Sequence, residues 1–313
     1  MRRRSLVLAL AAASMVAVPA LVGAASADPS ELAPGSHPGN GNGNGNQAVY
    51  QYARGQSGSR YGGGSRVLMT NHGGPVMHSV QVTPIFWGTS WPSYTGDEIS
   101  GIDTFYKGFL GSTYAAASTE YTDSTGKKVL SDSSHNGVAG HLLDSSAASG
   151  GQNTGTILNE VAKMIPNPAA NGYYPVYTDL PRGNAGYCAW HSNGTVRGVS
   201  VQFAFFWKLD GDAGCDPQST VGGQTEGLAA SANVSGHELS EAMTDPALNA
   251  WYDGSGNENG DKCAWSFGAP YVTFTDGTRW KIQGEWSNNV YNKVAGYTGY
   301  ANNSGQLGCL SGA

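Results

Sequence analysis

At residues 234–246 the chain reads Val-Ser-Gly-His-Glu-Leu-Ser-Glu-Ala-Met-Thr-Asp-Pro. We predict a helix that begins near Gly227 and ends at Thr244, because Pro246 disfavours helical geometry in the residue before it. A helix places residues four positions apart on one face. One imidazole and two carboxylates, at positions 237, 241 and 245, therefore lie in a row. Burying such a row in a small and apolar segment is costly unless the groups bind something, so the stretch predicts a metal site.

The pattern His237-Glu238-x-x-Glu241 differs by one residue from the H-E-x-x-H signature of the zincin metallopeptidases. In that signature two ligands project from one helix face, and the adjacent glutamate activates a metal-bound water. The pattern thus predicts His237 and Glu241 as metal ligands and Glu238 as a general base. Because a carboxylate replaces the second histidine, Zn²⁺ is the expected ion and another divalent ion stays open.

A third ligand has to come from another segment. Asp261 follows Glu241 by twenty positions, a spacing similar to that of zincins whose third ligand is an acid on a later segment. Glu258 and Asp253 compete for this role. Asp245 is a further alternative, although its carboxylate can instead hold the turn that ends the helix. Two other interpretations remain beside the catalytic one: a solvated polar helix face, and a structural metal or buried histidine–carboxylate network without catalysis.

Other histidines lie outside the helix. His191, in Cys-Ala-Trp-His-Ser at 188–192, precedes a strongly apolar run and can stabilise a developing oxyanion or act as a ligand. His72 is expected to cap a turn and His78 to be structural, while His135 and His141 lie in polar loops. No G-x-S-x-G, G-x-G-x-x-G or P-loop pattern occurs, so a serine triad and nucleotide binding are not indicated.

Residues 1–27 are predicted to be a signal peptide. Three arginines at positions 2–4 precede an apolar, alanine-rich run and an Ala-Ser-Ala cleavage site at 25–27. Without this segment Lys+Arg falls from 17 to 14 against 23 Asp+Glu, so the net charge changes from −6 to −9. We therefore expect a secreted, extracellular protein that binds neither nucleic acid nor, after signal cleavage, the membrane.

Residues 28–66 are predicted to be a disordered linker, because this Gly-, Asn- and Ser-rich segment has no apolar face to bury. Residues 67–313 are then expected to form a single globular domain. All four cysteines lie in it, and an even number in an exported chain favours two disulfides. Of the three pairings we favour the sequential one, Cys188–Cys215 and Cys263–Cys309.

Periodicity predicts helices at residues 96–110 and 156–165 besides the one at 227–244. Strands are expected at 80–87, 174–180 and 198–207, and hairpins near 122–130 and between 271–275 and 279–283. Helices and strands mix without a regular βαβ repeat, which indicates an α/β fold in which helices flank a mixed sheet. We expect a zincin-like arrangement with a loop-rich, aromatic C-terminal subdomain.

Five stretches, in the same order along the chain, resemble the EXORDIUM/phosphate-induced protein 1 family, and most closely its secreted microbial relatives. They are Asn-His-Gly-Gly-Pro-Val at 71–76, Ile-Phe-Trp-Gly at 85–88, and the segments 188–192, 237–246 and 249–252. The similarity extends from Val67 to Cys309. Microbial relatives often carry Glu-Ile-Gly-Asp where residues 258–261 read Glu-Asn-Gly-Asp, so the acids match and the isoleucine does not. The resemblance implies a secreted protein with an H-E-x-x-E helix, and the family's plant members are cell-wall proteins linked to growth.

Two functions are expected from these features. One is a secreted metal-dependent hydrolase, most simply a zinc peptidase acting on an extracellular peptide, with His191 polarising the intermediate. The other is a non-catalytic protein that binds a cell-wall polymer or carbohydrate through its aromatic tail and holds a structural metal. A weaker form of the enzyme is a glycosidase that pairs Glu238 with Glu258 or Glu285. In each case we expect a monomer.

Overall fold

The protein is described here by a computed structural model covering residues 48–56, 68–151, 153–268, 270–292 and 308–310. Its main element is an eight-stranded mixed sheet in the order β1-β8-β9-β7-β3-β5, with β4 beside β7 and β6 beside β4. Strand β8 is antiparallel to both neighbours, whereas β9, β7, β3, β4, β5 and β6 pair in parallel. The strands are β1 (Ala48–Tyr52), β3 (Gln81–Val82), β4 (Ile85–Trp87), β5 (Gly137–Val138), β6 (Leu142–Asp144), β7 (Gly172–Pro181), β8 (Tyr187–Val196) and β9 (Val199–Lys208).

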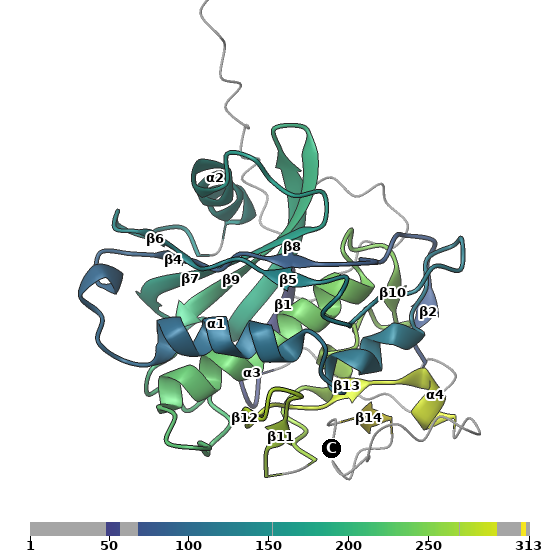
Figure 1. The fold of residues 1–313 in the computed structure, drawn as a ribbon. Helices are drawn as coiled ribbons and strands as arrows, with labels where there is room; N and C mark the ends of the chain where they lie inside the picture. The colour runs from purple at the N-terminus through teal and green to yellow at the C-terminus, as the bar shows by residue number, and fades with distance from the viewer. Residues whose placement is uncertain (1–47, 57–67, 152, 269, 293–307, 311–313) are drawn as a thin grey trace, which may run out of the picture.

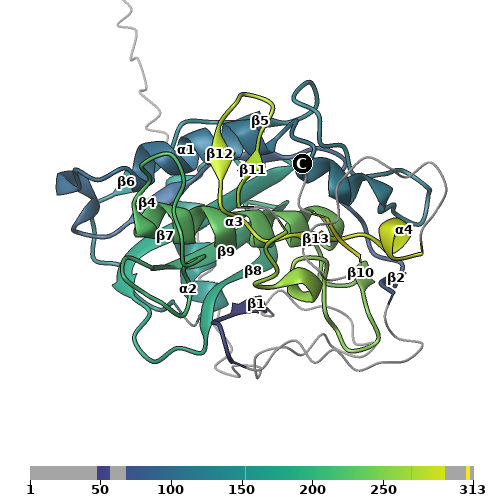
Figure 2. The ribbon, with the colours of Figure 1, turned by 90° about the horizontal axis from the view of Figure 1, so that it is seen from below.

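Helices cover both faces of this sheet. Helix α2 (Thr154–Met164) lies on one face, and α1 (Glu98–Phe109) and α3 (Glu226–Thr244) lie on the other (Figure 1). Seen from below, α1 and α3 run side by side across the strands (Figure 2). The prediction of a mixed α/β fold is confirmed, and the three predicted helices are present within two residues of their expected starts. No helix in the described part of the chain has both the length and the apolar character needed to cross a membrane.

The strand predictions are confirmed with two differences. The run at 80–87 is divided into β3 and β4 at Thr83-Pro84, because proline has no N–H to donate to a ladder. Strand β8 was not predicted, since its sequence shows no apolar–polar alternation. It joins β9 through Arg197-Gly198, where φ is +50° and +82°, the positive values that a two-residue hairpin turn requires.

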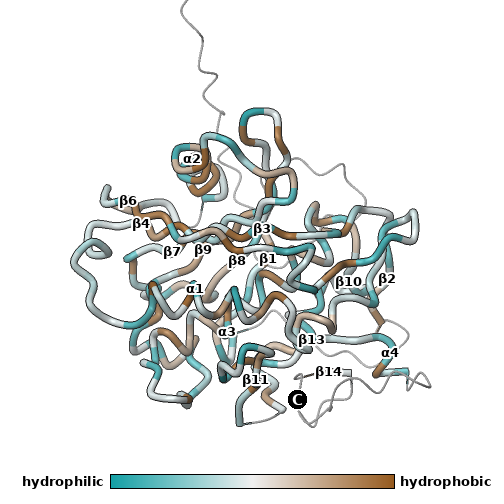
Figure 3. The backbone as a smooth tube through the Cα atoms, in the orientation of Figure 1, coloured by the Kyte–Doolittle hydropathy of each residue, from teal (hydrophilic) through white to brown (hydrophobic). Residues whose placement is uncertain are grey.

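The core lies between the sheet and its helices, and apolar residues follow the central strands (Figure 3). Three rings on neighbouring strands stack: Tyr177 lies 5.0 Å from Phe86 and 4.4 Å from Phe206, measured between centroids. The Tyr177 hydroxyl also hydrogen-bonds Tyr106 of α1 at 2.8 Å and Ser235 of α3 at 2.5 Å. The Tyr177 hydroxyl thus joins both α1 and α3 to the sheet.

The structure differs from the expected disorder at the end of the linker. Residues 48–52, within the segment 28–66, form strand β1 at the edge of the sheet. The reason is local composition: Ala-Val-Tyr-Gln-Tyr interrupts the Gly- and Asn-rich segment, and its residues Val49, Tyr50 and Gln51 are buried. The expected signal peptide and the linker residues 28–47 and 57–66 lie outside the described residues.

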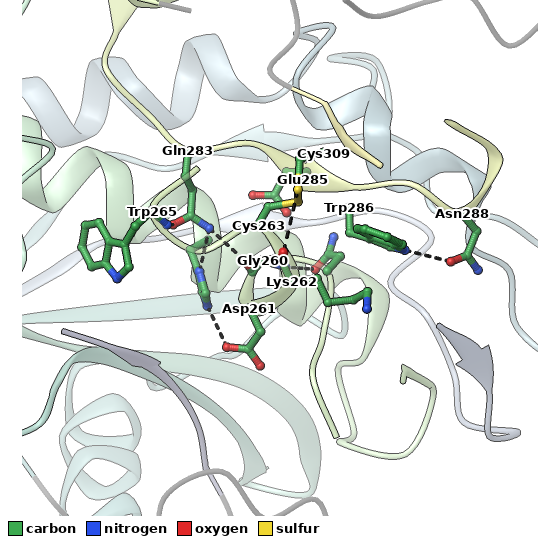
Figure 4. Close-up of a disulfide and its surroundings, with 12 residues drawn as sticks. Gly260, Asp261, Lys262, Cys263, Trp265, Gln283, Glu285, Trp286, Asn288 and Cys309 are labelled. Atoms are coloured by element: carbon green, nitrogen blue, oxygen red, sulfur yellow. Dashed lines mark hydrogen bonds and ion pairs between the residues drawn. A yellow bond between two sulfur atoms is a disulfide. The ribbon is translucent and has the colours of Figure 1, made fainter. Parts of the chain in front are cut away.

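Short elements build the C-terminal part. Both predicted disulfides are present, with Cα–Cα distances of 5.7 Å, and Cys263–Cys309 ties this part together (Figure 4). The predicted hairpin around Asp276-Gly277 is confirmed, and the 122–130 region contains a single antiparallel bridge. The short elements of this part are β10 (Trp251–Tyr252), η3 (Asp261–Cys263, a 3₁₀ helix), β11 (Val272–Thr273), β12 (Arg279–Trp280), β13 (Glu285–Trp286), α4 (Asn288–Tyr291) and β14 (Cys309–Leu310). Those earlier in the chain are β2 (Thr70–Asn71) and the 3₁₀ helices η1 (Trp91–Ser93) and η2 (Ala115–Glu120).

Candidate metal centre

Helix α3 is defined at both ends by side-chain hydrogen bonds. At its start the Thr225 hydroxyl accepts from the Leu228 amide at 3.2 Å, an N-cap. At its end the Asp245 carboxylate accepts from the amides of Asn249 and Ala250 at 2.6 and 2.7 Å. Asp245 therefore holds the exit turn, which is the structural alternative weighed for it. Every residue from 227 to 244 is buried, so the interpretation as a solvated polar helix face is wrong.

Six titratable side chains from three segments meet beside this helix. His237 Nε2 lies 3.0 Å from Glu241 Oε1, and His191 Nε2 lies 3.3 Å from the other oxygen of the same carboxylate. His191 Nε2 is also 3.5 Å from Glu258 Oε2. Asp261 Oδ1 lies further away, 3.7 Å from His237 Nε2. The Glu241 carboxylate is thus the centre of a cluster contributed by α3, β8 and the η3 loop: His191, His237, Glu238, Glu241, Glu258 and Asp261.

The spacing of these atoms fits a metal ion. Ligand atoms bound at about 2.0–2.1 Å in a tetrahedral zinc site lie about 3.3–3.4 Å from one another, and the three closest contacts of the cluster are 3.0, 3.3 and 3.5 Å. Its buried atoms without a hydrogen-bond partner among the described residues include His191 Nε2, His237 Nε2 and Glu241 Oε2, and buried polar atoms are seldom left without a partner. The ligand atoms form two groups that share Glu241, one with His191 and Glu258 and one with His237 and Glu238, each within 4.8 Å. A cation in either group would meet both imidazole and carboxylate donors.

The electrostatics of the cluster favour positive charge. Burial would lower the pKa of His237, but the Glu241 carboxylate outweighs it and raises the pKa to about 9. Burial would also lower the pKa of His191, but the Glu258 and Glu241 carboxylates outweigh it and raise that pKa well above its usual range. In return, although burial opposes it, His237 lowers the pKa of Glu241 to about 2. The acids hold protons on both imidazoles, and a metal ion would take the place of those protons.

Gln283 supports His237 from the side opposite Glu241. Its Nε2 lies 2.9 Å from His237 Nδ1 and donates to the Gly260 carbonyl at 2.9 Å, while its Oε1 accepts from the Trp265 amide at 3.3 Å. In this orientation His237 Nδ1 accepts, so the ring is neutral with its proton on Nε2, facing Glu241. The protonated ring that the raised pKa favours carries a proton on Nδ1 as well and needs the Gln283 oxygen there. Metal binding at Nε2 requires the other tautomer, so the Gln283 amide has to turn over and accept from Nδ1–H. Sequence reasoning missed Gln283, although it comes just before the Glu285 that was considered.

Glu238 shares a group with His237 and Glu241, with ligand atoms within 4.8 Å of one another. It is fully buried, and neither carboxyl oxygen has a hydrogen-bond partner in the described structure. Burial, and then the charge of Glu241, raises its pKa well above the usual range, whereas His191 lowers it. The backbone amide of Gln51 also faces this carboxyl and lowers its pKa, a smaller effect, with a geometry outside that of a hydrogen bond. Glu238 is therefore a buried acid that lies beside the cluster without a structural partner.

Two other acids are placed by their own partners. The Asp253 carboxylate accepts from its loop amides and forms an ion pair with the buried Lys262 at 2.9 Å, so it is not available as the third ligand. Glu285 accepts from the Tyr114 hydroxyl at 2.6 Å, and burial raises its pKa to about 8. It lies close enough to His237 to affect that pKa, and Figure 4 shows it beside the disulfide and above Asp261.

The remaining described histidines lie outside the cluster. His72 stacks on Tyr252 at 3.6 Å between centroids. The others each contact a carboxylate: His78 with Asp123, His135 with Asp132 and His141 with Asp103. The contact of His78 agrees with the structural role expected for it, and the two histidines placed in polar loops have partners. His72 was expected to cap a turn, but Asn71 Oδ1 accepts from the Gly73 amide there at 2.6 Å.

The aromatic tail is mostly internal. Among the described residues of this part, Trp280 and Trp286 are buried, Trp251 and Trp265 are half-buried, and Tyr271 is 40% exposed. The rings therefore form a small core rather than an exposed row of platforms. No protein-family model, curated protein or solved structure matches the chain in the comparisons made.

Proposed function

We propose that the chain is a secreted, divalent-metal-dependent hydrolase, most simply a zinc peptidase of zincin-like arrangement. The observation that carries the proposal is the position of the Glu241 carboxylate between two imidazoles, His237 at 3.0 Å and His191 at 3.3 Å. Glu258 supplies a further carboxylate at 3.5 Å from His191. Imidazole and carboxylate ligands suit Zn²⁺. The resemblance to the EXORDIUM family and the two disulfides support an extracellular setting.

In this proposal His191, Glu241 and Glu258 hold the ion, because their ligand atoms lie within 4.8 Å of one another, and His237, which is in a second such group around Glu241, moves toward the ion to complete the set. His191 is then a ligand rather than an oxyanion group. Asp261 positions Glu241, because its backbone amide donates to Glu241 Oε1 at 2.9 Å. Its carboxylate, 3.7 Å from His237 Nε2, is the alternative to Glu258 as an acid ligand.

A bound Zn²⁺ supplies a Lewis acid and lowers the pKa of a water at the site. Glu238 accepts one proton from the attacking water as the water oxygen bonds to the substrate carbonyl carbon. It then delivers that proton to the amine nitrogen as the C–N bond breaks. Glu238 suits this role because it has no hydrogen bond to give up. The charge of a nearby dication also lowers the pKa of Glu238, so the base is ionised in the metal-loaded protein.

The second candidate is a non-catalytic extracellular protein with a structural metal. The observation in its favour is the burial of the ligands: His191 is 1% exposed, and His237, Glu241 and Glu258 are 0% exposed. The aromatic tail gives the sugar-binding form of this candidate little support, because its rings are mostly internal.

The test is the Glu238→Gln variant, with Glu226→Gln as a matched control at an exposed position of the same helix. We expect both to contain one Zn²⁺ per chain by elemental analysis. Hydrolysis of an unfolded protein substrate, assayed for the intact chain and after limited proteolysis, should fall by at least about 100-fold in Glu238→Gln alone. Absence of bound metal in the wild-type protein rejects the site. Bound metal without hydrolysis in any form selects the structural candidate.

A further inference from the structure

Strand β1 lies at the edge of the sheet, next to the metal cluster. It pairs antiparallel with β8, with Val49 opposite His191 and Gln51 opposite Ala189. Opposite residues of a strand pair project their side chains to the same face. His191 projects to the face of α3, where it meets Glu241, so Val49 and Gln51 point to that face as well. The strand therefore presents two side chains toward the cluster.

Gln51 connects β1 to the site directly. It is 0% exposed, and its Nε2 donates to Gln283 Oε1 at 3.1 Å. Gln283 in turn contacts His237 at 2.9 Å, so Gln51 helps to hold the amide in the orientation that opposes metal binding at Nε2. The Gln51 backbone also lies near enough to the Glu238 carboxyl to lower its pKa slightly. One residue of β1 thus lies beside the proposed base and fixes the support of a proposed ligand.

The residues that follow the strand are held between β8 and the C-terminal part. The Ala53 amide donates to Gly186 O at 3.0 Å, and the Arg54 amide to Gly214 O at 2.7 Å. Trp265 Nε1 donates to the Tyr52 carbonyl at 2.9 Å, and the Arg54 guanidinium lies 4.7 Å from the Trp265 ring centroid. Trp265 belongs to the same loop as Asp261 and lies next to Gln283 (Figure 4). Residues 48–54 therefore fill a slot whose two walls both carry site residues.

The contacts of β1 are those that a separate extended peptide can make. A strand adds to a sheet edge through main-chain hydrogen bonds, and pockets for alternate side chains give selectivity. The Tyr50 ring provides such a contact on the opposite face, 4.7 Å from the Tyr187 ring. A five-residue strand with one sheet neighbour is also among the elements that open before a domain unfolds.

We propose that the β8 edge is a binding groove for an extended peptide and that residues 48–54 fill it as an internal blocking segment. The hydrolysis of that peptide rests on the proposed function, whereas its binding does not. Removal of β1 exposes Glu238 and releases Gln283, so the site opens to a substrate strand in the same step. The preferred peptide has an aromatic residue at the position of Tyr50 and a small or amide side chain at the two positions facing α3.

The experiment uses the full chain with a specific protease site inserted within residues 57–67. The folded protein is cut, and the N-terminal fragment is removed by gel filtration in mild denaturant followed by refolding with Zn²⁺. A fluorescent peptide of residues 46–56 is then titrated into it and followed by anisotropy. The control peptide carries Tyr50→Pro. This change removes a main-chain N–H from the strand and the ring that lies 4.7 Å from Tyr187.

We expect the peptide to bind the fragment-free protein, and the Tyr50→Pro peptide to bind it about tenfold more weakly. The rate of hydrolysis should rise at least about tenfold after the fragment is removed, and it should fall again when the peptide is added. A folded, metal-loaded protein that does not bind the peptide overturns the inference, as does equal hydrolysis by the intact and fragment-free forms. Peptide binding without hydrolysis in any form supports the groove and rejects the hydrolase. If the fragment-free protein does not refold, the intact Gln51→Ala variant replaces it: faster hydrogen exchange in β8 and faster hydrolysis support the inference, and unchanged values overturn it.

Discussion

Removal of the metal should destabilise the protein strongly, and replacement of Glu241 should abolish that effect. The reason is the charge of the cluster. Glu241 lies within 3.3 Å of two imidazoles, and the Glu238 and Glu258 carboxyls are close enough to act on the same His191. A bound dication neutralises these acids and satisfies the unpartnered nitrogens, whereas without it the acids have only protons on the imidazoles as counter-charges.

The size of the effect follows from linkage. Free Zn²⁺ at about 1,000 times its Kd stabilises the folded state by about 4 kcal/mol. In a domain of this size 1 kcal/mol corresponds to about 2–4 °C in Tm, so chelation should lower Tm by about 8–16 °C. Glu241→Gln removes the carboxylate shared by both imidazoles, and we expect its Zn²⁺ affinity to fall by more than about 100-fold. Breaking this buried ion pair should also cost the metal-free protein about 3–5 kcal/mol.

Calorimetry with and without a chelator, together with elemental analysis, checks this prediction. The control is Glu226→Gln, the same substitution at an exposed position of α3, which should keep both the metal and the Tm shift. A wild-type protein whose Tm is the same with chelator and with added Zn²⁺ would refute the reasoning from charge. A Glu241→Gln protein that keeps its metal would show that the ion binds elsewhere.

Two further predictions concern single side chains. Burial, and then the hydrogen bond with the Asp144 carboxyl, raises the pKa of Glu160 from 4.5 to about 7. An acid whose pKa is higher in the folded state destabilises the fold as pH rises from 4.5 through 7. Glu160→Gln should therefore raise the free energy of unfolding by about 1 kcal/mol at pH 8, a value reduced for solvent screening, and leave it unchanged at pH 4. Urea unfolding at the two pH values measures this difference. A Cβ at Gly260 would lie 2.9 Å from the His237 ring, whereas one at Gly140 meets nothing within 4 Å. Gly260→Ala should therefore weaken Zn²⁺ binding at least about tenfold by titration calorimetry, and Gly140→Ala should leave it unchanged; equal affinities would contradict the tight packing inferred around His237.

The parts of the site that depend on local spacing were predictable. The helix follows from its small residues and Pro246, and His237 and Glu241 follow from the i, i+4 rule. The third ligand could not be predicted in the same way, because Asp253 and Glu258 look alike in sequence. Only the fold shows that Lys262 pairs with Asp253 at 2.9 Å.

Contacts between distant segments were not predictable at all. Gln51 and Gln283 are separated by 232 positions, and their hydrogen bond is buried. Neither residue belongs to a motif, and composition assigned Gln51 to a linker. Strand β1 forms because a few apolar residues find an open edge of the sheet, which is a property of the tertiary structure rather than of the segment.

The choice between a structural and a catalytic metal can be argued from Glu238. A structural site needs ligands and groups that orient them, and the other acids of the cluster have such roles. Glu238 has no hydrogen-bond partner in the described structure, so in a structural site it would only cost desolvation free energy. It lies between the buried Tyr106 and Tyr173, whose pKa values are raised by burial and also by its charge, and Gln51 of β1, a strand at the sheet edge. A base without a partner under a removable cover is what a hydrolase with a blocked substrate groove requires, and it has no use in a permanently closed site.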